Sequence, residues 1–277
     1  MTKAPGKGIR AAVVQMTSTD QVEENLGAAA GLLEEAAALG AELVVLPETF
    51  GYMGRCETDR LSVAERPGDG PQQDFLALAA ARLEISIVGG TIPVLDGDDR
   101  PRARSIVWNE TGNVVGVYDK IHLFDVEVPG RERAYRESAG THAGSEAVVV
   151  PSPLGPLGLS VCYDVRFPEL YRGLVRAGAL CLTVPAAFTV PTGEAHWDVL
   201  IRARAVENLA FVLAAAQVGE HPGGRRTWGH AMIVDPWGRV LGSRAAGPGV
   251  VVSDLDLAAQ AGLRERFPAL THVSDFL

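Results

Sequence analysis

The chain has 277 residues, and 47% of them are hydrophobic, so it is long enough to bury one large core. Its net charge of −9 excludes a general binder of nucleic acids or anionic membranes, because both surfaces would repel it. No stretch approaches the ~20 apolar residues of a transmembrane helix, and the basic segment 1–8 leads into a strand pattern instead of a signal-peptide core.

The number and spacing of the cysteines indicate in which cellular compartment the protein works and whether it binds a metal. The chain has 3 cysteines, they are widely spaced, and they cannot all pair with one another. No Cys/His cluster has the spacing of a zinc site. We therefore expect a reduced, cytoplasmic protein that needs neither a metal nor an organic cofactor.

The first half of the chain alternates strand and helix patterns. Asp20 is a capping signal for the first helix, Gly40 is its stop signal, and Pro71 begins the second helix. Glu-Thr-Gly-Asn at 110–113 is a hairpin signal. The predicted elements are strand 9–16, helix 20–39, strand 42–47, helix 71–83, strand 85–92 and the paired strands 105–109 and 114–121.

The second half repeats this pattern after a charged loop at 122–145, whose length inside a compact domain indicates a functional role. Its predicted elements are strands 147–150 and 157–161, helix 168–177, strand 180–185, helix 194–208, strand 211–217, a hairpin around 235–238 and strand 250–255. Alternation in both halves predicts an α/β fold with sheets face to face and helices outside. No linker or change of composition divides the chain, so we predict a single domain over 1–277.

Three residues of complementary chemistry each follow an apolar, strand-like run. Cys162 stands between such a run and the helix start at Pro168, where backbone N–H groups can bind an oxyanion. Glu48 follows the run 43–47, which predicts a desolvated carboxylate that can accept a proton. Lys120 ends a third run, and beside Cys162 it would favour the thiolate and stabilise an oxyanion. In layered α/β proteins, catalytic and binding residues are often found at strand ends and in the loops that follow them.

These segments resemble the nitrilase superfamily of carbon–nitrogen hydrolases, in the order that the family shows. The motifs are Leu-Pro-Glu at 46–48, Lys-Ile-His-Leu-Phe-Asp at 120–125, Cys-Tyr-Asp-Val-Arg-Phe-Pro-Glu-Leu at 162–170 and Pro-Thr-Gly-Glu-Ala-His-Trp at 191–197. The last three are typical of the small-amidase branch, which includes ω-amidase and deaminated-glutathione amidase. Segments from 197 to 238 are more similar to the second of these. The resemblance covers most of the chain.

The resemblance implies a fold, a set of site residues and an assembly. The fold is a four-layer α–β–β–α sandwich with the site between its halves, and the assembly is a homodimer or a larger homo-oligomer. Glu48, Lys120 and Cys162 match the family's Glu–Lys–Cys triad, and the backbone N–H of Tyr163 completes its oxyanion site. Further site residues implied by the resemblance are a second active-site glutamate, Glu137, and the substrate-binding residues Arg166, Phe188 and Thr192.

The predicted activity is hydrolysis of an amide that carries a carboxylate, through a Cys162 thioester, with release of ammonia and an acid. The resemblance favours deaminated glutathione as the substrate. ω-Amides of short α-keto dicarboxylates are the alternative, followed by nitriles and N-carbamoyl amines. A small-molecule amide is the expected partner, without nucleic acid or membrane.

Two different interpretations stay open. A non-catalytic interaction protein on the same fold would carry a broken triad, and the sequence shows an intact one. A Cys–His hydrolase would use His122 or His196 as its base, although a histidine that supports the loop is the more ordinary interpretation of His122. Cys181 reads as a packed strand residue, and Cys56 has no predicted role.

Overall fold

The structure is a computed structural model that describes residues 8–127 and 134–272. The basic segment 1–7 and residues 128–133 of the predicted loop lie outside the described residues.

The first sheet has parallel strands from the start of the chain at its centre. Its order is β14 (Arg226–Trp228), β13 (Ala216–Glu220), β1 (Ile9–Met16), β2 (Leu43–Val45), β3 (Ser86–Val88), β5 (Arg102–Trp108) and β4 (Ile92–Val94), with β17 (Gly249–Leu255) on β1 and β6 (Val114–Asp119) on β5.

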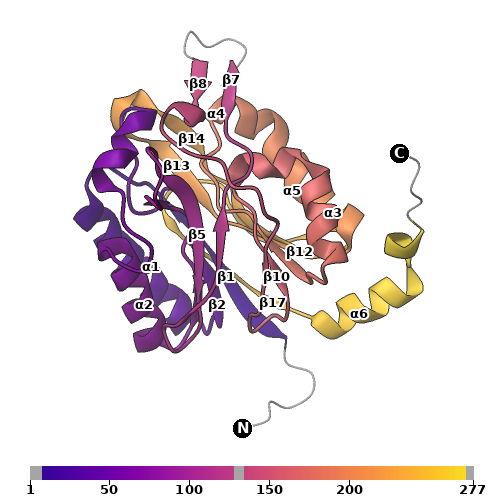
Figure 1. The fold of residues 1–277 in the computed structure, drawn as a ribbon. Coiled ribbons are helices and arrows are strands. Elements are labelled where there is room, and N and C mark those ends of the chain that lie inside the picture. The colour runs from indigo at the N-terminus through magenta and orange to yellow at the C-terminus, as the bar shows by residue number, and fades with distance from the viewer. Residues whose placement is uncertain (1–7, 128–133, 273–277) are drawn as a thin grey trace.

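Alternation along β1 shows how this sheet is covered on both faces. Ala11 and Val13 belong to the core shared with the second sheet, whereas Ala12 and Val14 pack in a separate cluster with the helices α1 (Val22–Ala38) and α2 (Pro71–Leu83). Successive side chains of a strand point to opposite faces, so one apolar strand can serve two cores. Figure 1 shows α1 and α2 together on one side of the molecule.

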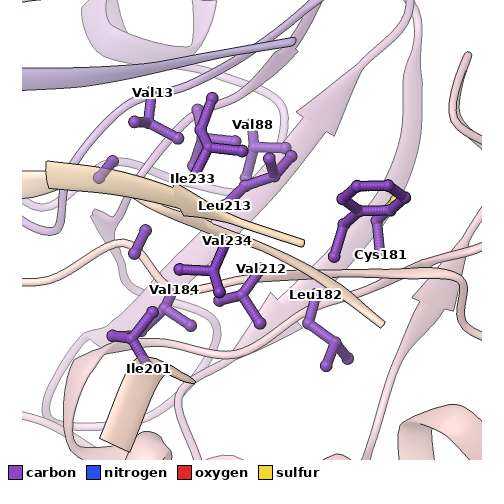
Figure 2. Close-up of a cluster of buried hydrophobic side chains, with 14 of the residues drawn as sticks. Val13, Val88, Cys181, Leu182, Val184, Ile201, Val212, Leu213, Ile233 and Val234 are labelled. Atoms are coloured by element: carbon purple, nitrogen blue, oxygen red, sulfur yellow. The ribbon is translucent and has the colours of Figure 1, made fainter. Parts of the chain in front are cut away.

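The second sheet packs against the first. Its order is β16 (Val240–Arg244), β15 (Ala231–Val234), β12 (Phe211–Ala214), β11 (Cys181–Thr183), β10 (Leu157–Gly158) and β9 (Val149–Val150). In Figure 2, Leu213 and Ile233 point toward Val13 of the first sheet, and Val212 points the other way, toward Ile201 of α5 (Asp198–Asn208). Helices α5 and α3 (Pro168–Arg176) cover that outer side (Figure 1). Within the described residues, the predicted α–β–β–α sandwich is confirmed.

Two of the predicted strands are each split into two, because apolar runs do not record where a strand changes partners. The run 211–217 is split at Ala215, and its second part, β13, crosses to the first sheet and pairs in parallel with β1. The run 85–92 is split at Gly90, which has φ +50. A Cβ there would lie 1.9 Å from the carbonyl oxygen of Pro47, so glycine permits the close approach beside Glu48.

Helix ends also differ from the predicted ones. Helix α1 begins at Val22 without a side-chain cap, because the Asp20 carboxylate binds Arg55 at 2.9 Å instead. The predicted helix 194–208 begins earlier, as α4 (Val190–Thr192) and a π-helical turn (Gly193–Trp197) that run into α5. Helix α6 (Leu257–Arg266) was not predicted. Gly40, with φ +82, ends the first helix as predicted.

The predicted loop 122–145 contains a small hairpin of β7 (Asp125–Glu127) and β8 (Ala134–Arg136), followed by a 3₁₀ turn at Glu137–Ala139. Figure 1 shows β7 and β8 projecting above α4. Among the residues described, no helix has the length and hydropathy required to cross a bilayer.

Candidate active site

Cys162 lies in a strained turn between β10 and α3. Its φ is +49, which a side-chain-bearing residue rarely adopts, and it begins a 3₁₀ turn over Cys162–Arg166. The backbone N–H of Cys162 donates to the carbonyl oxygen of Pro185 at 2.9 Å, which ties the turn to the end of β11. The residue is 8% exposed. The turn thus holds the thiol at the end of the second sheet, as predicted.

The buried carboxylate of Asp164 joins this turn to the segment that carries Lys120. It accepts hydrogen bonds from the N–H of Val161 at 2.8 Å and from the Tyr118 hydroxyl at 2.7 Å. It also accepts the backbone N–H of His122 at 3.0 Å and lies 2.7 Å from His122 Nδ1. A fully hydrogen-bonded buried carboxylate fixes its neighbours in position. Asp164 therefore sets the placement of Cys162 relative to Lys120.

Lys120 binds the predicted glutamates. Its Nζ lies 2.7 Å from Glu48 Oε1 and 2.8 Å from Glu137 Oε2, and all these side chains are buried. The other Glu48 oxygen accepts the backbone N–H of Ala187 at 3.0 Å. Glu48 and Lys120 come from ends of the first sheet, and Cys162 and Ala187 from ends of the second. The structure thus brings the predicted residues together where the two sheets meet.

Glu137 is held in place on several sides. Besides Lys120, its carboxylate accepts the backbone N–H of Phe124 at 2.7 Å and lies 3.4 Å from Arg60 Nη1. Burial alone would raise the pKa of Glu137, but the charges of Lys120 and Arg60 outweigh it and lower the pKa to about 2. Glu137 therefore stays ionised and positions Lys120.

Lys120 and Cys162 are both buried, but Lys120 is charged and Cys162 is neutral. Burial would lower the pKa of Lys120, but the carboxylates of Glu137 and Glu48 outweigh it and raise the pKa, so the amine is an ammonium. Burial and the nearby Glu48 charge raise the pKa of Cys162 well above its ordinary value, and Lys120 opposes this only in part. Cys162 is thus a neutral thiol beside the Glu48 carboxylate.

We predict that Glu137 makes folding stability depend on pH. Its pKa falls from 4.5 to about 2 on folding, so its ionised form stabilises the fold above pH 4.5, and this contribution is lost as pH falls toward 2. The free energy of unfolding should therefore differ more between the wild type and Glu137→Gln at pH 6 than at pH 3. Urea denaturation of both proteins at each pH measures this difference. A constant difference would contradict the ion-pair assignment.

A pocket opens over the cluster, and its empty space of about 460 Å³ is partly open to solvent. Of the predicted substrate-binding residues, Tyr163, Phe188 and Thr192 line it. Arg166 does not line it, but its guanidinium lies 5.7 Å from the Tyr163 ring centroid and 5.4 Å from that of Phe188. The other predicted site residues therefore line one cavity, and Arg166 lies close to the two aromatic rings in its lining.

The pocket also contains charged residues that sequence interpretation missed. Arg60, Glu57 and Arg225 line it, and Arg60 binds Glu57 at 2.7 Å. Arg60 and Glu57 come from a 3₁₀ helix at Glu57–Val63, and Arg225 precedes β14. These segments show neither a helix pattern nor a strand pattern long enough to read, so nothing in the sequence marked them.

The histidines do not line the pocket as a base would. His122 is engaged by Asp164 and stacks on Phe167 with ring centroids 3.6 Å apart. His196 Nδ1 lies 3.2 Å from Arg166 Nη1. The supporting role expected for His122 therefore fits its contacts.

The other cysteines lie apart from this cluster. Burial raises the pKa of Cys181 in β11 to about 12, which fits a packed strand residue. Cys56 is exposed, and its thiol donates to Asp59 at 2.8 Å. Among the residues described, no group of His, Cys, Asp or Glu could hold a metal ion.

Comparison with known proteins identifies the family. Residues 10–265 match the carbon–nitrogen hydrolase family. The deaminated glutathione amidase of Synechocystis sp. (strain PCC 6803) is 42% identical over 266 residues, which cover 95% of this chain and 97% of the relative. The structure is similar to the NitFhit protein of C. elegans, with a TM-score of 0.90 and 37% identity over 96% of this chain and 65% of that chain.

A second structural match agrees with the first. Nit3 of Saccharomyces cerevisiae, a member of branch 10 of the nitrilase superfamily, has a TM-score of 0.85 and 31% identity, covering 96% of this chain and 97% of that chain. Sequence and fold match over nearly the same span, and the resemblance seen in the motifs is confirmed. The chain belongs to the carbon–nitrogen hydrolase family of the nitrilase superfamily.

Proposed function

We propose that this protein is an amidase that hydrolyses deaminated glutathione. The observation that carries the proposal is the buried cluster in which Lys120 contacts Glu48 and Glu137 beside the Cys162 thiol. The similarity to a deaminated glutathione amidase over 95% of this chain supports the choice of substrate. A Cys–His hydrolase is disfavoured by the contacts of the histidines, and a non-catalytic protein is disfavoured by the intact cluster.

The geometry supports the following first half-reaction. Glu48 takes the proton of the Cys162 thiol, and the sulfur attacks the amide carbon to form a C–S bond. The Lys120 ammonium and the Tyr163 backbone N–H stabilise the oxyanion. The C–N bond then breaks, and the departing nitrogen takes the proton from Glu48. Because its low pKa keeps Glu137 ionised, the proton donor in this proposal is Glu48.

The second half-reaction restores the enzyme. Glu48 takes a proton from water, and the oxygen of the hydroxide formed in this way bonds to the carbonyl carbon of the thioester. The C–S bond breaks, the acid leaves, and the sulfur regains its proton. The amine released earlier depends on the substrate: ammonia from a primary amide, and cysteinylglycine from deaminated glutathione, whose amide nitrogen belongs to that dipeptide.

A substrate panel tests the proposed function directly. The panel contains deaminated glutathione, a primary ω-amide of a short α-keto dicarboxylate, a nitrile and an N-carbamoyl amine. We expect the highest kcat/KM for deaminated glutathione, measured by release of the 2-oxo acid and of the amine. A higher kcat/KM for the primary ω-amide would make the protein an ω-amidase, and turnover of the nitrile alone would overturn the amidase proposal.

We further propose that Arg166 selects substrates whose acyl half carries a free carboxylate. The guanidinium lies near the wall formed by Tyr163 and Phe188, and the N-terminus of α3 follows it closely, where anions are favoured. Removing a charge-assisted contact lowers kcat/KM by roughly 10- to 150-fold. Arg166→Met should therefore lose this much on an ω-amide acid and little on its neutral ester. Equal losses on both would mean a structural role.

We also propose a homodimer or larger assembly in a reducing compartment such as the cytoplasm. The catalytic thiol must stay reduced, which favours that compartment. Trp237 and Phe267 are 57% and 50% exposed, and their ring centroids lie 5.8 Å apart on the surface near α6. Such exposed aromatic pairs are common at interfaces. Sedimentation of the purified protein would distinguish a monomer from an assembly.

A further inference from the structure

A second chamber lies beside the catalytic pocket, and its empty space of about 690 Å³ is partly open to solvent. Its lining includes Arg55, Tyr135, Arg136 and Gly223, and we call it the side chamber. Glu57 and Arg225 line both the side chamber and the catalytic pocket, so the two cavities are neighbours with a shared wall. The chamber therefore offers room for a part of the substrate that the catalytic pocket does not hold.

The amine half of the substrate is the part that needs such room. When a primary ω-amide is hydrolysed, the leaving group is ammonia, and the acyl half fills the catalytic pocket. When deaminated glutathione is hydrolysed, the leaving amine is a dipeptide that ends in a carboxylate. Because the catalytic pocket and the side chamber share a wall, an acyl half in the pocket would place its amine half toward the side chamber.

The charges of the side chamber fit an anion. Arg55, Arg136 and Arg225 line it, against the carboxylate of Glu57. Glu57 is bound by Arg60 at 2.7 Å, which offsets its charge. Arg55 is paired with Asp20 at 2.9 Å and Arg136 with Glu127 at 3.3 Å, whereas the described ion pair of Arg225 is longer, at 3.8 Å from Glu57. The planar donors of a guanidinium match a carboxylate.

Among the described arginines and lysines that line the two cavities, Arg225 has a buried donor without a partner. Lys120 binds Glu48 and Glu137, and Arg60 binds Glu57 together with the Thr141 hydroxyl at 2.7 Å. Arg225 is different, because its Nη1 is 3.8 Å from Glu57 Oε1 and contacts the sulfur of Met53 at 3.8 Å.

The Nε of Arg225 is buried and has no hydrogen-bond partner in the described structure. Buried donors of this kind normally have an acceptor. A bound carboxylate would supply acceptors to this guanidinium.

Contacts around Arg225 hold the guanidinium at the junction of the two cavities. It lies 5.5 Å from the ring centroid of Tyr135, at the base of the β7–β8 hairpin seen in Figure 1. Gly223, with φ +73, brings the chain so close to Arg55 that a Cβ would lie 2.7 Å from its carbonyl oxygen. The wall is thus built by close packing of distant segments.

We infer that the side chamber is the leaving-group subsite, and that Arg225, assisted by Arg136, binds the terminal carboxylate of a peptide-like amine. This inference rests on the proposed amidase function and deepens it. It separates two roles for cations: Arg166 acts on the carboxylate of the acyl half, and Arg225 acts on the carboxylate of the amine half. A substrate without the amine half makes no use of Arg225.

The test compares deaminated glutathione with its C-terminal carboxamide in the wild type and in Arg225→Met. The measured quantity is the ratio of kcat/KM for the acid to kcat/KM for the carboxamide. Removing a charge-assisted contact should lower this ratio by roughly 10- to 150-fold. Arg226→Met is the matched control, because Arg226 is the next residue and its side chain is exposed. The ratio of the control should equal that of the wild type.

Arg136→Met is the second variant. The Arg136 side chain is exposed, so this variant should fold even if Arg225→Met does not. The same ratio should fall in this variant, by less than in Arg225→Met. Unchanged ratios in the folded variants would overturn the inference while leaving the amidase proposal intact. Hydrolysis of a primary ω-amide alone by the wild type would also overturn it. No hydrolysis of any amide by the wild type would instead mean that the proposed function itself is wrong.

Discussion

Replacing Cys162 by alanine is expected to lower kcat by at least about 10⁴-fold, the scale on which removal of a covalent nucleophile acts. The thiol is buried in a turn with φ +49 beside the Glu48 carboxylate, and in the proposed mechanism it supplies the atom that attacks the amide. Alanine is smaller than cysteine and fits the same turn. The loss should therefore appear in kcat with the fold preserved, as circular dichroism would show.

An acyl-enzyme provides the direct evidence for this role. Mass spectrometry after rapid acid quench should show the acyl half of the substrate on the peptide that contains Cys162. Cys181→Ala is the matched control, because Cys181 is also buried but lies in β11 with a pKa raised to about 12. Normal turnover by Cys162→Ala, or an adduct on another residue, would contradict the thioester mechanism.

Replacing Glu48 by glutamine is expected to lower kcat by ~10²–10⁴-fold, the usual contribution of a positioned base. The pKa of Cys162 is raised by burial and by the Glu48 charge, so the thiol does not ionise by itself at neutral pH. Glutamine has nearly the size of glutamate, but its single amide oxygen can accept only one of the two bonds that the carboxylate accepts from Lys120 and the Ala187 N–H. The variant should therefore fold with some loss of stability, while proton transfer is lost.

The control for this prediction is His122→Ala. His122 contacts Asp164 and stacks on Phe167, so its removal should affect stability more than chemistry. Measuring kcat and the free energy of unfolding for both variants separates the two roles, because loss of a base lowers kcat, whereas loss of a supporting contact lowers stability. Near-normal kcat in Glu48→Gln together with an inactive His122→Ala would replace the Glu48 mechanism by a Cys–His mechanism.

The sequence by itself determined the layers of the fold and the core of the site. Alternation and apolar runs mark faces that must be buried, and helix α2 was predicted with the bounds that the structure gives, Pro71–Leu83. Glu48, Lys120 and Cys162 could be recognised because each follows its own strand-like run in the order typical of the family. These signals are local, so one sequence carries them.

Tertiary structure alone decided which distant segments meet. The run 211–217 reads as one strand, yet it serves both sheets, since an apolar run does not record its partners. Arg60 and Arg225 lie in short irregular segments, and packing brings them into one pocket with Lys120. The same packing fixes charge states: burial beside Glu48 keeps Cys162 a thiol, and the ion pair with Lys120 keeps Glu137 ionised. Desolvation and the distance between charges exist only once the chain is folded, and so these properties could not be read from the sequence.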